Sequence, residues 1–172
     1  REVEDSAALE PSETGIPPEP DDVVAVDTGD WSENAIVAIA AGGWHTCVLG
    51  QDRRAQCWGR NSEGQLDSPD TDLRVIAAGR RFSCGIRNDL NVLCWGEGAD
   101  SVLQTSRLMW TLDAGRDFVC GLDQQGNISC FGDNTVGQLD APSGQFAALD
   151  VGDRHSCAIK TSGEISCWVG NQ

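Results

Sequence analysis

Eight cysteines are the residues of this 172-residue chain whose type and spacing could do chemistry. They fall into pairs with nine residues between the two members: Cys47 and Cys57, Cys84 and Cys94, Cys120 and Cys130, and Cys157 and Cys167. Paired cysteines can form disulfides, bind a metal ion or supply a reactive thiolate, and their spacing helps to separate these three chemistries.

The spacing disfavours metal binding, because structural zinc sites usually separate paired cysteines by about two to four residues. His45 and His155 each lie two residues before a cysteine, but Phe82 and Phe118 occupy the same place in the other copies. A position filled by either His or Phe indicates a planar, partly buried ring. We therefore expect no metal and no cofactor. Since every cysteine has a partner, we also expect no catalytic residue; the enzyme-like alternative is an approach of His45 to His155 in a closed ring.

The cysteine pairs mark an internal repeat, because equivalent positions recur after 37, 36 and 37 residues. An aliphatic residue, two further residues and a glycine precede each pair, at 39–42, 76–79, 112–115 and 149–152. An aromatic residue follows the second cysteine of each pair, as Trp58, Trp95, Phe131 and Trp168. The repeat is the strongest signal in the sequence.

Each copy predicts three β-strands, of which the second and third form a hairpin that carries the two cysteines. If the cysteines lie opposite each other, the pleat predicts the next pairs on the same face. These pairs are Leu49 with Ala55, Ile86 with Val92, Leu122 with Ile128, and Ile159 with Ile165, and all eight residues are apolar. Opposed residues can lie about 4.5 Å apart at Cα, within reach of a disulfide. We therefore predict one disulfide per hairpin, each worth roughly 2–3 kcal/mol in the loop-entropy model.

The hairpin tips differ at their fourth position, where a tight turn often needs a positive φ. Gly126 and Gly163 occupy this position in the last two copies, and Arg53 and Leu90 in the first two. The first two tips must therefore adopt another turn or carry strain.

Three strands repeated about every 37 residues are typical of a propeller blade, which buries its faces only against its neighbours. We predict an all-β fold, a β-propeller of four repeat blades with one disulfide per blade. It forms a small closed ring or a partial propeller completed by another chain. The predicted domain covers residues 34–172, with repeats at about 36–72, 73–109, 110–146 and 147–172.

Residues 1–33 read as an acidic, Pro-rich tail or linker with too little apolar surface to fold alone. They hold eleven acidic residues and one arginine, so they contribute −10 to the net charge of −15. The β-prone run 23–26 could add an outer strand to the last repeat. The acidic balance disfavours nucleic acid as a partner, and no apolar run approaches the length of a membrane span.

The segments AGGWHTCVL and CWGRNSEGQL, within residues 41–66, resemble the regulator-of-chromosome-condensation repeat family, and the resemblance covers about residues 36–170. The cysteine-rich form is most similar to the secreted branch, with Crinkly-type receptor ectodomains and propeller-type β-lactamase inhibitor proteins. The resemblance implies a propeller that serves as a protein-binding disc. The nucleotide-exchange activity of the nuclear members does not carry over, because this chain is acidic and is predicted to hold disulfides.

The sequence departs from the family in four respects. The second copy has EGADSVLQTSRLMW at 97–110 instead of the Asn-x-x-Gly-Gln-Leu stretch, and Asp67 and Asp140 follow the GQL motif where the family usually has Gly. The last copy reads CWVG instead of CWG. The family typically has seven blades, whereas four copies are present here. Three architectures are therefore compatible with the sequence: a small closed ring, an arc completed by a second chain, and a fragment of something longer.

In each copy a short loop joins the repeated glycine to the position that holds His or Phe. These four loops should gather on one face around the propeller axis. They carry the predicted protein-binding residues, Trp44, Arg80, Arg81, Arg116, Asp117, Asp153 and Arg154. The alternative is a solvated rim whose arginines pair with neighbouring Asp. The connections at 60–73, 97–110 and 133–146 are a second candidate surface, with Met109 and Trp110 as an exposed anchor or as a cover for the next blade.

We therefore expect a non-catalytic protein-interaction module, either alone with a protein partner or as a homo-oligomer or subunit of a larger complex. The alternatives are a secreted enzyme inhibitor and, from another class, a propeller enzyme with its site on the axis. Four disulfides would place the chain in an extracytoplasmic compartment, secreted, periplasmic or at the cell surface.

Overall fold

Four three-stranded antiparallel sheets make up the computed structural model, which describes residues 35–99 and 108–169. The first two sheets contain β1 (Ile36–Ala41), β2 (His45–Gly50) and β3 (Ala55–Gly59), then β4 (Leu73–Ala78), β5 (Phe82–Arg87) and β6 (Val92–Gly96). The other two contain β7 (Thr111–Ala114), β8 (Phe118–Leu122) and β9 (Ile128–Gly132), then β10 (Phe146–Val151), β11 (Ser156–Lys160) and β12 (Ile165–Trp168). We call these sheets blades 1 to 4 in chain order. The all-β architecture of repeated blades is confirmed.

The hairpin register agrees with the predicted one in every blade. The two cysteines of each hairpin lie opposite each other, and the next pairs on the same face are those predicted, from Leu49 with Ala55 to Ile159 with Ile165. Each blade holds one disulfide within its hairpin, with Cα atoms 4.0–4.1 Å apart. The short Cα separation follows from the direct opposition of the two residues.

Each blade has two different faces, and both are packed in blades 2 and 3. The cysteine face carries the disulfide and the apolar pair beside it, and it lies against the following blade. The aliphatic face carries the aliphatic residues at or just before the first strand and the aromatic residue of the third, and it lies against the preceding blade. At the first junction Cys47, Leu49 and Ala55 of blade 1 share a buried cluster with Leu73, Ile76 and Trp95 of blade 2. Residues at equivalent positions form clusters between blades 2 and 3 and between blades 3 and 4, although the last cluster includes no cysteine.

Two series of backbone hydrogen bonds repeat this junction along the chain. At the hairpin tips, the N–H groups of Leu73, Met109 and Phe146 donate to the carbonyls of Arg53, Leu90 and Gly126 in the preceding blade. At the other end of the blades, the N–H groups of Gly43, Arg80 and Arg116 donate to the carbonyls of Gly79, Arg116 and Asp153 in the following blade. The bonds at the tips keep one register at all three junctions. In the other series the first acceptor, Gly79, lies one residue before Arg80, which is the position equivalent to Arg116 and Asp153.

The connections with the GQL motif fasten two of the three junctions. The backbone carbonyl of Gln65 accepts the indole N–H of Trp95 at 3.0 Å, and the carbonyl of Gln138 accepts that of Trp168 at the same distance. Asn61 and Asn134 each hold their own loop, and their amides donate to Asp67 and Asp140. The aspartates that depart from the family pattern are therefore part of the loop structure.

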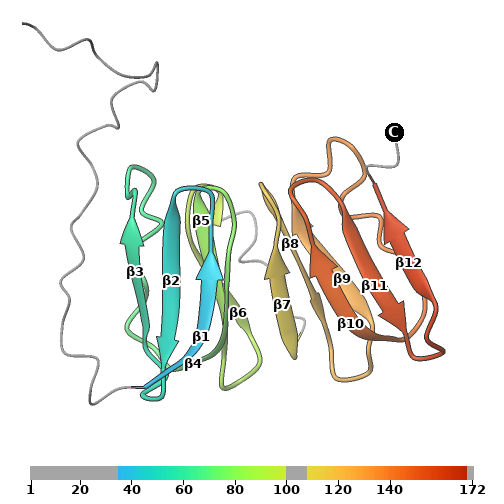
Figure 1. Cartoon of the computed structure of the whole chain (residues 1–172), viewed down its shortest axis with the longest axis horizontal. Helices are drawn as coiled ribbons and strands as arrows, with labels where there is room; N and C mark the ends of the chain where they lie inside the picture. Colours follow the sequence, from blue (N-terminus) through green and yellow to red (C-terminus); the bar gives the residue numbers. More distant parts are fainter. Residues whose placement is uncertain (1–34, 100–107, 170–172) are drawn as a thin grey trace, which may run out of the picture.

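The described part of the chain is an open row of blades. Every extensive contact between strands of different blades joins neighbours in chain order, and Figure 1 shows blades 1 and 4 at opposite ends. His45 lies at the junction of blades 1 and 2 and His155 lies on blade 4, so the approach of the two histidines expected for a closed ring does not occur. The acidic tail and the run 23–26 lie outside the described residues.

In all four hairpin tips the residue at the fourth position has a positive φ, in the left-handed region. The φ angles are 64° at Arg53, 67° at Leu90, 81° at Gly126 and 91° at Gly163. The first two tips therefore adopt the same turn as the others and do so with strain. An L side chain in this region of φ costs about 1–2 kcal/mol.

We predict that Arg53→Gly stabilises the fold by up to about 1 kcal/mol, because glycine relieves this strain. Gly163→Ala should destabilise it by about the same amount, since no atom lies within 4 Å of the added Cβ and only the backbone cost remains. Urea unfolding measures both variants. Equal signs for the two changes would contradict the interpretation.

Candidate protein-binding face

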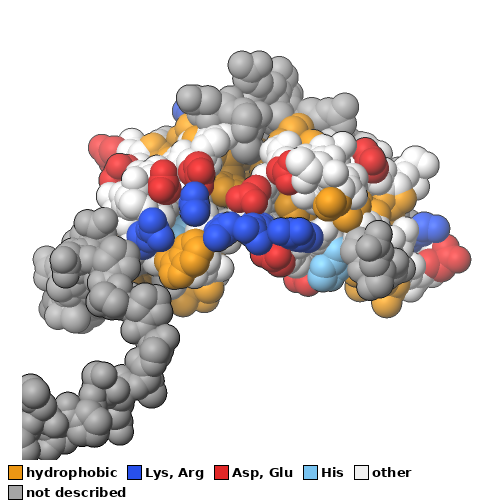
Figure 2. Space-filling model, turned by 90° about the horizontal axis from the view of Figure 1, so that it is seen from above, with side chains coloured by type: hydrophobic (Ala, Val, Ile, Leu, Met, Phe, Trp, Pro, Cys, Tyr) orange, Lys and Arg blue, Asp and Glu red, His pale blue; other side chains and the backbone are white. Residues whose placement is uncertain are grey.

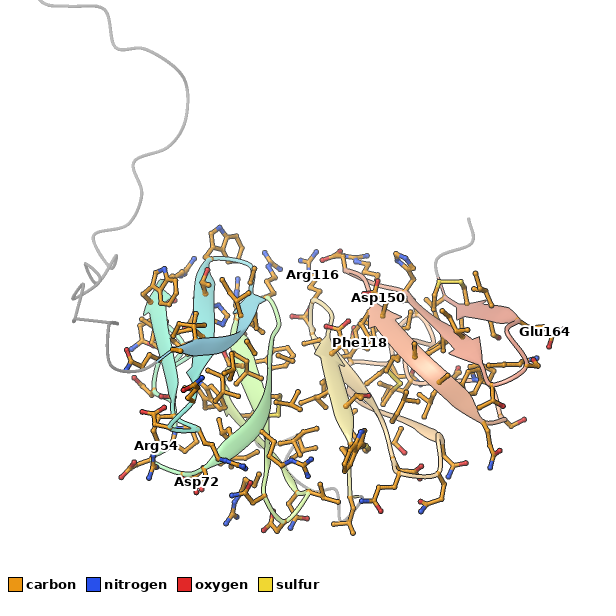
Figure 3. All side chains as sticks on the ribbon, turned by 60° about the horizontal axis from the view of Figure 1, so that its bottom comes forward. Arg54, Asp72, Arg116, Phe118, Asp150 and Glu164 are labelled. Carbon is orange, nitrogen blue, oxygen red and sulfur yellow. A yellow bond between two sulfur atoms is a disulfide. The ribbon has the colours of Figure 1, made fainter. Side chains whose placement is uncertain are left out.

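The loops that join the first and second strands of each blade meet in one hollow. These inner loops are residues 42–44, 79–81, 115–117 and 152–155, and all four blades contribute to the hollow of about 430 Å³. Figure 2 shows basic side chains gathered in a band along the hollowed edge of the molecule, and Figure 3 shows Arg116 at this end of blade 3. We call this surface the inner face.

A glycine begins each inner loop because the ring three residues later leaves no room for a side chain. A Cβ on Gly79 or Gly115 would collide with the ring of Phe82 or Phe118, and a Cβ on Gly42 would collide with the His45 ring. This ring is buried in blades 1 to 3, whereas His155 of blade 4 is exposed. The repeated sequence pattern of small residue, glycine and ring follows from this packing.

Trp44 is the aromatic residue of the inner face and stays 47% exposed. The guanidinium of Arg80 lies 5.0 Å from the centre of its ring, and that of Arg60 lies 5.6 Å away. Both distances are within the range of a cation–π interaction. The indole therefore contacts two cations and is still about half exposed.

Three arginines of the inner face have carboxylate partners. Arg81 lies 3.1 Å from Glu97, Arg116 lies 3.3 Å from Asp117, and Arg154 lies 3.7 Å from Asp153. These pairs are partly or fully exposed, and such pairs add little stability. Arg60 and Arg80 form no ion pair among the described residues. Asp133 lies beside Arg116 and Arg154 in a small hollow of the same face. Five arginines thus face four carboxylates, so the inner face keeps a small positive excess on an acidic chain.

The structure brings the predicted binding residues together in two groups. Trp44, Arg80, Arg116 and Asp153 line the main hollow. Asp117 and Arg154 line a small adjoining hollow that also includes Arg116 and Asp153, and Arg81 is paired with Glu97 beside the hollow. The paired arginines fit the alternative of a solvated rim whose arginines bind neighbouring acidic residues. Arg80 does not fit it, because it contacts Trp44 instead of an acidic residue.

Sequence reasoning missed Arg60 and Glu97, which also belong to the inner face. Each directly follows the Cys-Trp-Gly motif, and its N–H donates to an inner-loop carbonyl, Arg60 to Trp44 and Glu97 to Arg81. Asp133 makes the same bond to Asp117 after Cys-Phe-Gly. The residue after this motif was therefore a repeat position that could have been assigned to the face.

A His–Ser pair lies beneath the inner face, between blades 1 and 2. The Nε2 of His45 lies 2.7 Å from the Oγ of Ser83, and both residues are buried. The Ser83 hydroxyl also contacts the Gln65 carbonyl at 3.3 Å. Burial lowers the pKa of His45 below its usual value, against a smaller opposing effect of its backbone hydrogen bond to Phe82. Because Ser83 is only 1% exposed, the pair fastens two blades and is closed to a substrate.

The second candidate surface is a set of structured loops. Asp70 and Asp72 both pair with Arg54 in the first of these connections. Met109 is fully buried between blades 2 and 3, so it covers the next blade. Trp110 is 49% exposed, with the Arg74 guanidinium 4.6 Å from its ring centre.

Two segments, residues 36–65 and 111–138, match the model of the regulator of chromosome condensation (RCC1) repeat. They span blade 1 and blade 3, each with the connection that ends near its GQL motif. No curated protein matches the sequence. The resemblance to this repeat family is confirmed.

Solved propellers share the fold. The ectodomain of the receptor kinase CR4 from Physcomitrella patens is 25% identical, with a TM-score of 0.71 over 78% of this chain and 41% of its own. The Crinkly ectodomain of the receptor kinase ACR4 from Arabidopsis thaliana is 27% identical, with a TM-score of 0.68 over 79% of this chain and 51% of its own. Prp20p from Saccharomyces cerevisiae, 19% identical with a TM-score of 0.67 over 80% of this chain and 45% of its own, shows the fold alone. This chain spans about half or less of the length of these proteins.

We predict that His45→Phe makes the fold less sensitive to acid. Since burial lowers the pKa of His45, the unfolded chain binds a proton more readily than the folded one below about pH 6.5, and the wild type loses stability as the pH falls through that value. His45→Phe should cost about 1 kcal/mol at neutral pH, because the bond to Ser83 is lost, but this deficit should shrink towards pH 5. His155 is present in both proteins, so the difference isolates His45. A deficit that is independent of pH would refute the prediction.

Proposed function

We propose that this chain of RCC1-type propeller repeats is a non-catalytic protein-interaction module of an extracytoplasmic space, and that its partner docks on the inner face. The observation that carries the proposal is the hollow to which all four blades contribute, with an exposed Trp44 in contact with two arginines. Trp and Arg are the residues that most often dominate the binding energy of protein interfaces.

The charge of the inner face indicates the chemistry of the partner. Arg60 and Arg80 have no acidic partner among the described residues, and they flank the indole of Trp44. A partner that offers a carboxylate next to an apolar group would pair with the guanidinium and cover the ring at once. We therefore infer that the partner presents an acidic segment with an apolar side chain.

Two observations support an extracytoplasmic location. Four disulfides persist in an oxidising environment and are rare in reducing compartments. The Crinkly ectodomain, which is similar in fold and 27% identical, belongs to a receptor kinase. Among residues 35–99 and 108–169, no helix is long and apolar enough to cross a membrane.

The proposed absence of catalysis rests on where the titratable groups lie. His45 and Ser83 are sealed between blades. The pKa of Asp113 is raised by burial, but its two carboxylate oxygens accept the N–H groups of Ala114 and Val151 within the fold. Neither of these sites offers a reactive group to the hollow. An enzyme inhibitor would use the same inner face, and the identity of the captured partner separates the two functions.

We predict that Arg80→Glu combined with Arg116→Glu abolishes partner capture, with at least a tenfold loss of recovery, because the face then repels an acidic segment. The matched control is Arg54→Glu combined with Arg87→Glu, which makes the same charge change near the hairpin tips; Figure 3 shows Arg54 at the opposite end of the blades from Arg116. Each immobilised protein is incubated with a native surface or secretion extract, and the bound proteins are quantified by mass spectrometry. Trp44→Ala should lose the same partners as the inner-face variant. Equal recovery on all four proteins would reject the inner face as the docking site.

A further inference from the structure

We propose that blade 4 of one copy docks on blade 1 of a second copy, head to tail, through the same junction that joins the blades within the chain. The proposal concerns the two ends of the row, so it is independent of the inner face and its partner. The two open faces are the two halves of an interface that the chain itself repeats three times.

The open face of blade 4 is a cysteine face without its cover. Ile159 and Ile165 are 43% and 71% exposed, whereas the equivalent Ile86 and Val92 of blade 2 are 0% and 8% exposed under blade 3. The disulfide shows the same contrast, because Cys167 is exposed while Cys94 of blade 2 is buried. Blade 4 therefore exposes the surface that an internal blade buries.

The open face of blade 1 is the complementary aliphatic face. Ile36 and Ile39 are 42% and 71% exposed, whereas their equivalents Leu73 and Ile76 in blade 2 are 0% and 8% exposed. Leu73 and Ile76 pack on the cysteine face of the preceding blade. Docking blade 1 of a second copy on blade 4 would give Ile36 and Ile39 the same environment.

Unpaired backbone groups continue the two hydrogen-bond series at this end. The carbonyls of Arg53, Leu90 and Gly126 each accept an N–H from the next blade, but the equivalent carbonyl of Gly163 has no partner among the described residues. The N–H of Asp153, the fourth member of the other series, also lacks one within residues 35–99 and 108–169. By the same register, Ile36 of a second copy would donate to the Gly163 carbonyl.

The position that holds His or Phe in each blade also finds an equivalent contact across the proposed junction. His45 of blade 1 meets the hydroxyl of Ser83 in blade 2, and Phe82 of blade 2 shares a buried cluster with Val119 of blade 3. At the third junction Ser156 lies 3.9 Å from the Cys120 sulfur. In a head-to-tail pair, the equivalent contact joins His155 to Thr46, which repeats the His–hydroxyl contact of the first junction.

A second copy suits this surface because each molecule carries both halves of the junction. An apolar patch on blade 4 and its complement on blade 1 cannot meet within one open row, and contacts between unlike patches on identical chains produce a ring or a longer row. Exposed apolar patches of this kind mark association sites. This complementarity is the reason for which we assign a second copy of this chain as the occupant.

The test measures the mass in solution of full-length wild type, Ile39→Asp, Ile165→Asp and the control Val136→Asp by analytical ultracentrifugation. Val136 is an aliphatic residue with 51% exposure in the connection between blades 3 and 4, and it lines the small hollow beside Arg116 and Asp153 instead of either open blade face. We expect wild type and Val136→Asp to exceed the 18.3 kDa of one chain as concentration rises, by a factor of two or more. Ile39→Asp and Ile165→Asp should each remain monomeric, because every head-to-tail contact between identical copies then includes one damaged face.

Mixing the two monomeric variants provides the decisive measurement. Ile165→Asp keeps an intact blade 1 and Ile39→Asp keeps an intact blade 4, so an equimolar mixture should form a one-to-one dimer through a single sound junction. Circular dichroism and thiol titration establish that each variant is folded and oxidised. A monomeric wild type, as expected if the tail covers these faces, or a mixture that stays monomeric, overturns the proposal. Self-association of either single variant would also overturn it.

A second measurement follows the exposed disulfide. Under graded reductant, alkylation should label Cys157 and Cys167 first in the monomeric Ile39→Asp variant, and several-fold more slowly in wild type at concentrations where it assembles. Ile39 lies on the far end of the row, so in one isolated molecule its substitution has no contact with this disulfide. Equal labelling rates in the two proteins would contradict the junction.

Discussion

The packing of one blade's disulfide-bearing face on the next blade's aliphatic face is the interaction on which the rest of the structure depends. A three-stranded sheet of this size exposes both faces to water when it is alone, so no blade can be stable by itself. The disulfide joins two strands of one hairpin and adds apolar surface at the centre of the junction. Stability therefore grows with each neighbour, and the ends of the row are its weakest points.

The polar groups at these junctions give the packing its register. The carbonyl groups of Gln65 and Gln138 accept the indole N–H groups of the following blades, and His45 contacts Ser83 where blades 2 and 3 place a phenyl ring. Buried polar groups are costly unless they are paired, so a blade shifted by one residue would lose these bonds along with its apolar contacts. The same requirement explains why the inner loops gather in a constant geometry, since each loop begins at a strand held by the junction.

The inner face combines two features that rarely coincide on an acidic protein. It concentrates arginines around an exposed indole, and three of the five arginines are screened by carboxylates on the same face. The unscreened Arg60 and Arg80 lie against Trp44, so attraction for an acidic partner is local to the aromatic residue. Long-range repulsion from the rest of the chain disfavours nucleic acids, while a short acidic peptide segment meets the cations at close range.

The sequence alone determined the repeat, the strand register and the disulfide pairing, because a period-two pattern admits a single arrangement in which eight apolar residues and four cysteine pairs share faces. It also identified most inner-loop residues, since symmetry places equivalent loops at equivalent ends. Only the tertiary structure decided that Arg53 and Leu90 adopt the strained turn, that Met109 is buried and that Arg60 joins Trp44. Likewise, only the fold showed the row to be open. These outcomes depend on the angle between neighbouring blades and on which long side chain reaches which ring, and neither is encoded in the spacing of residues along one strand.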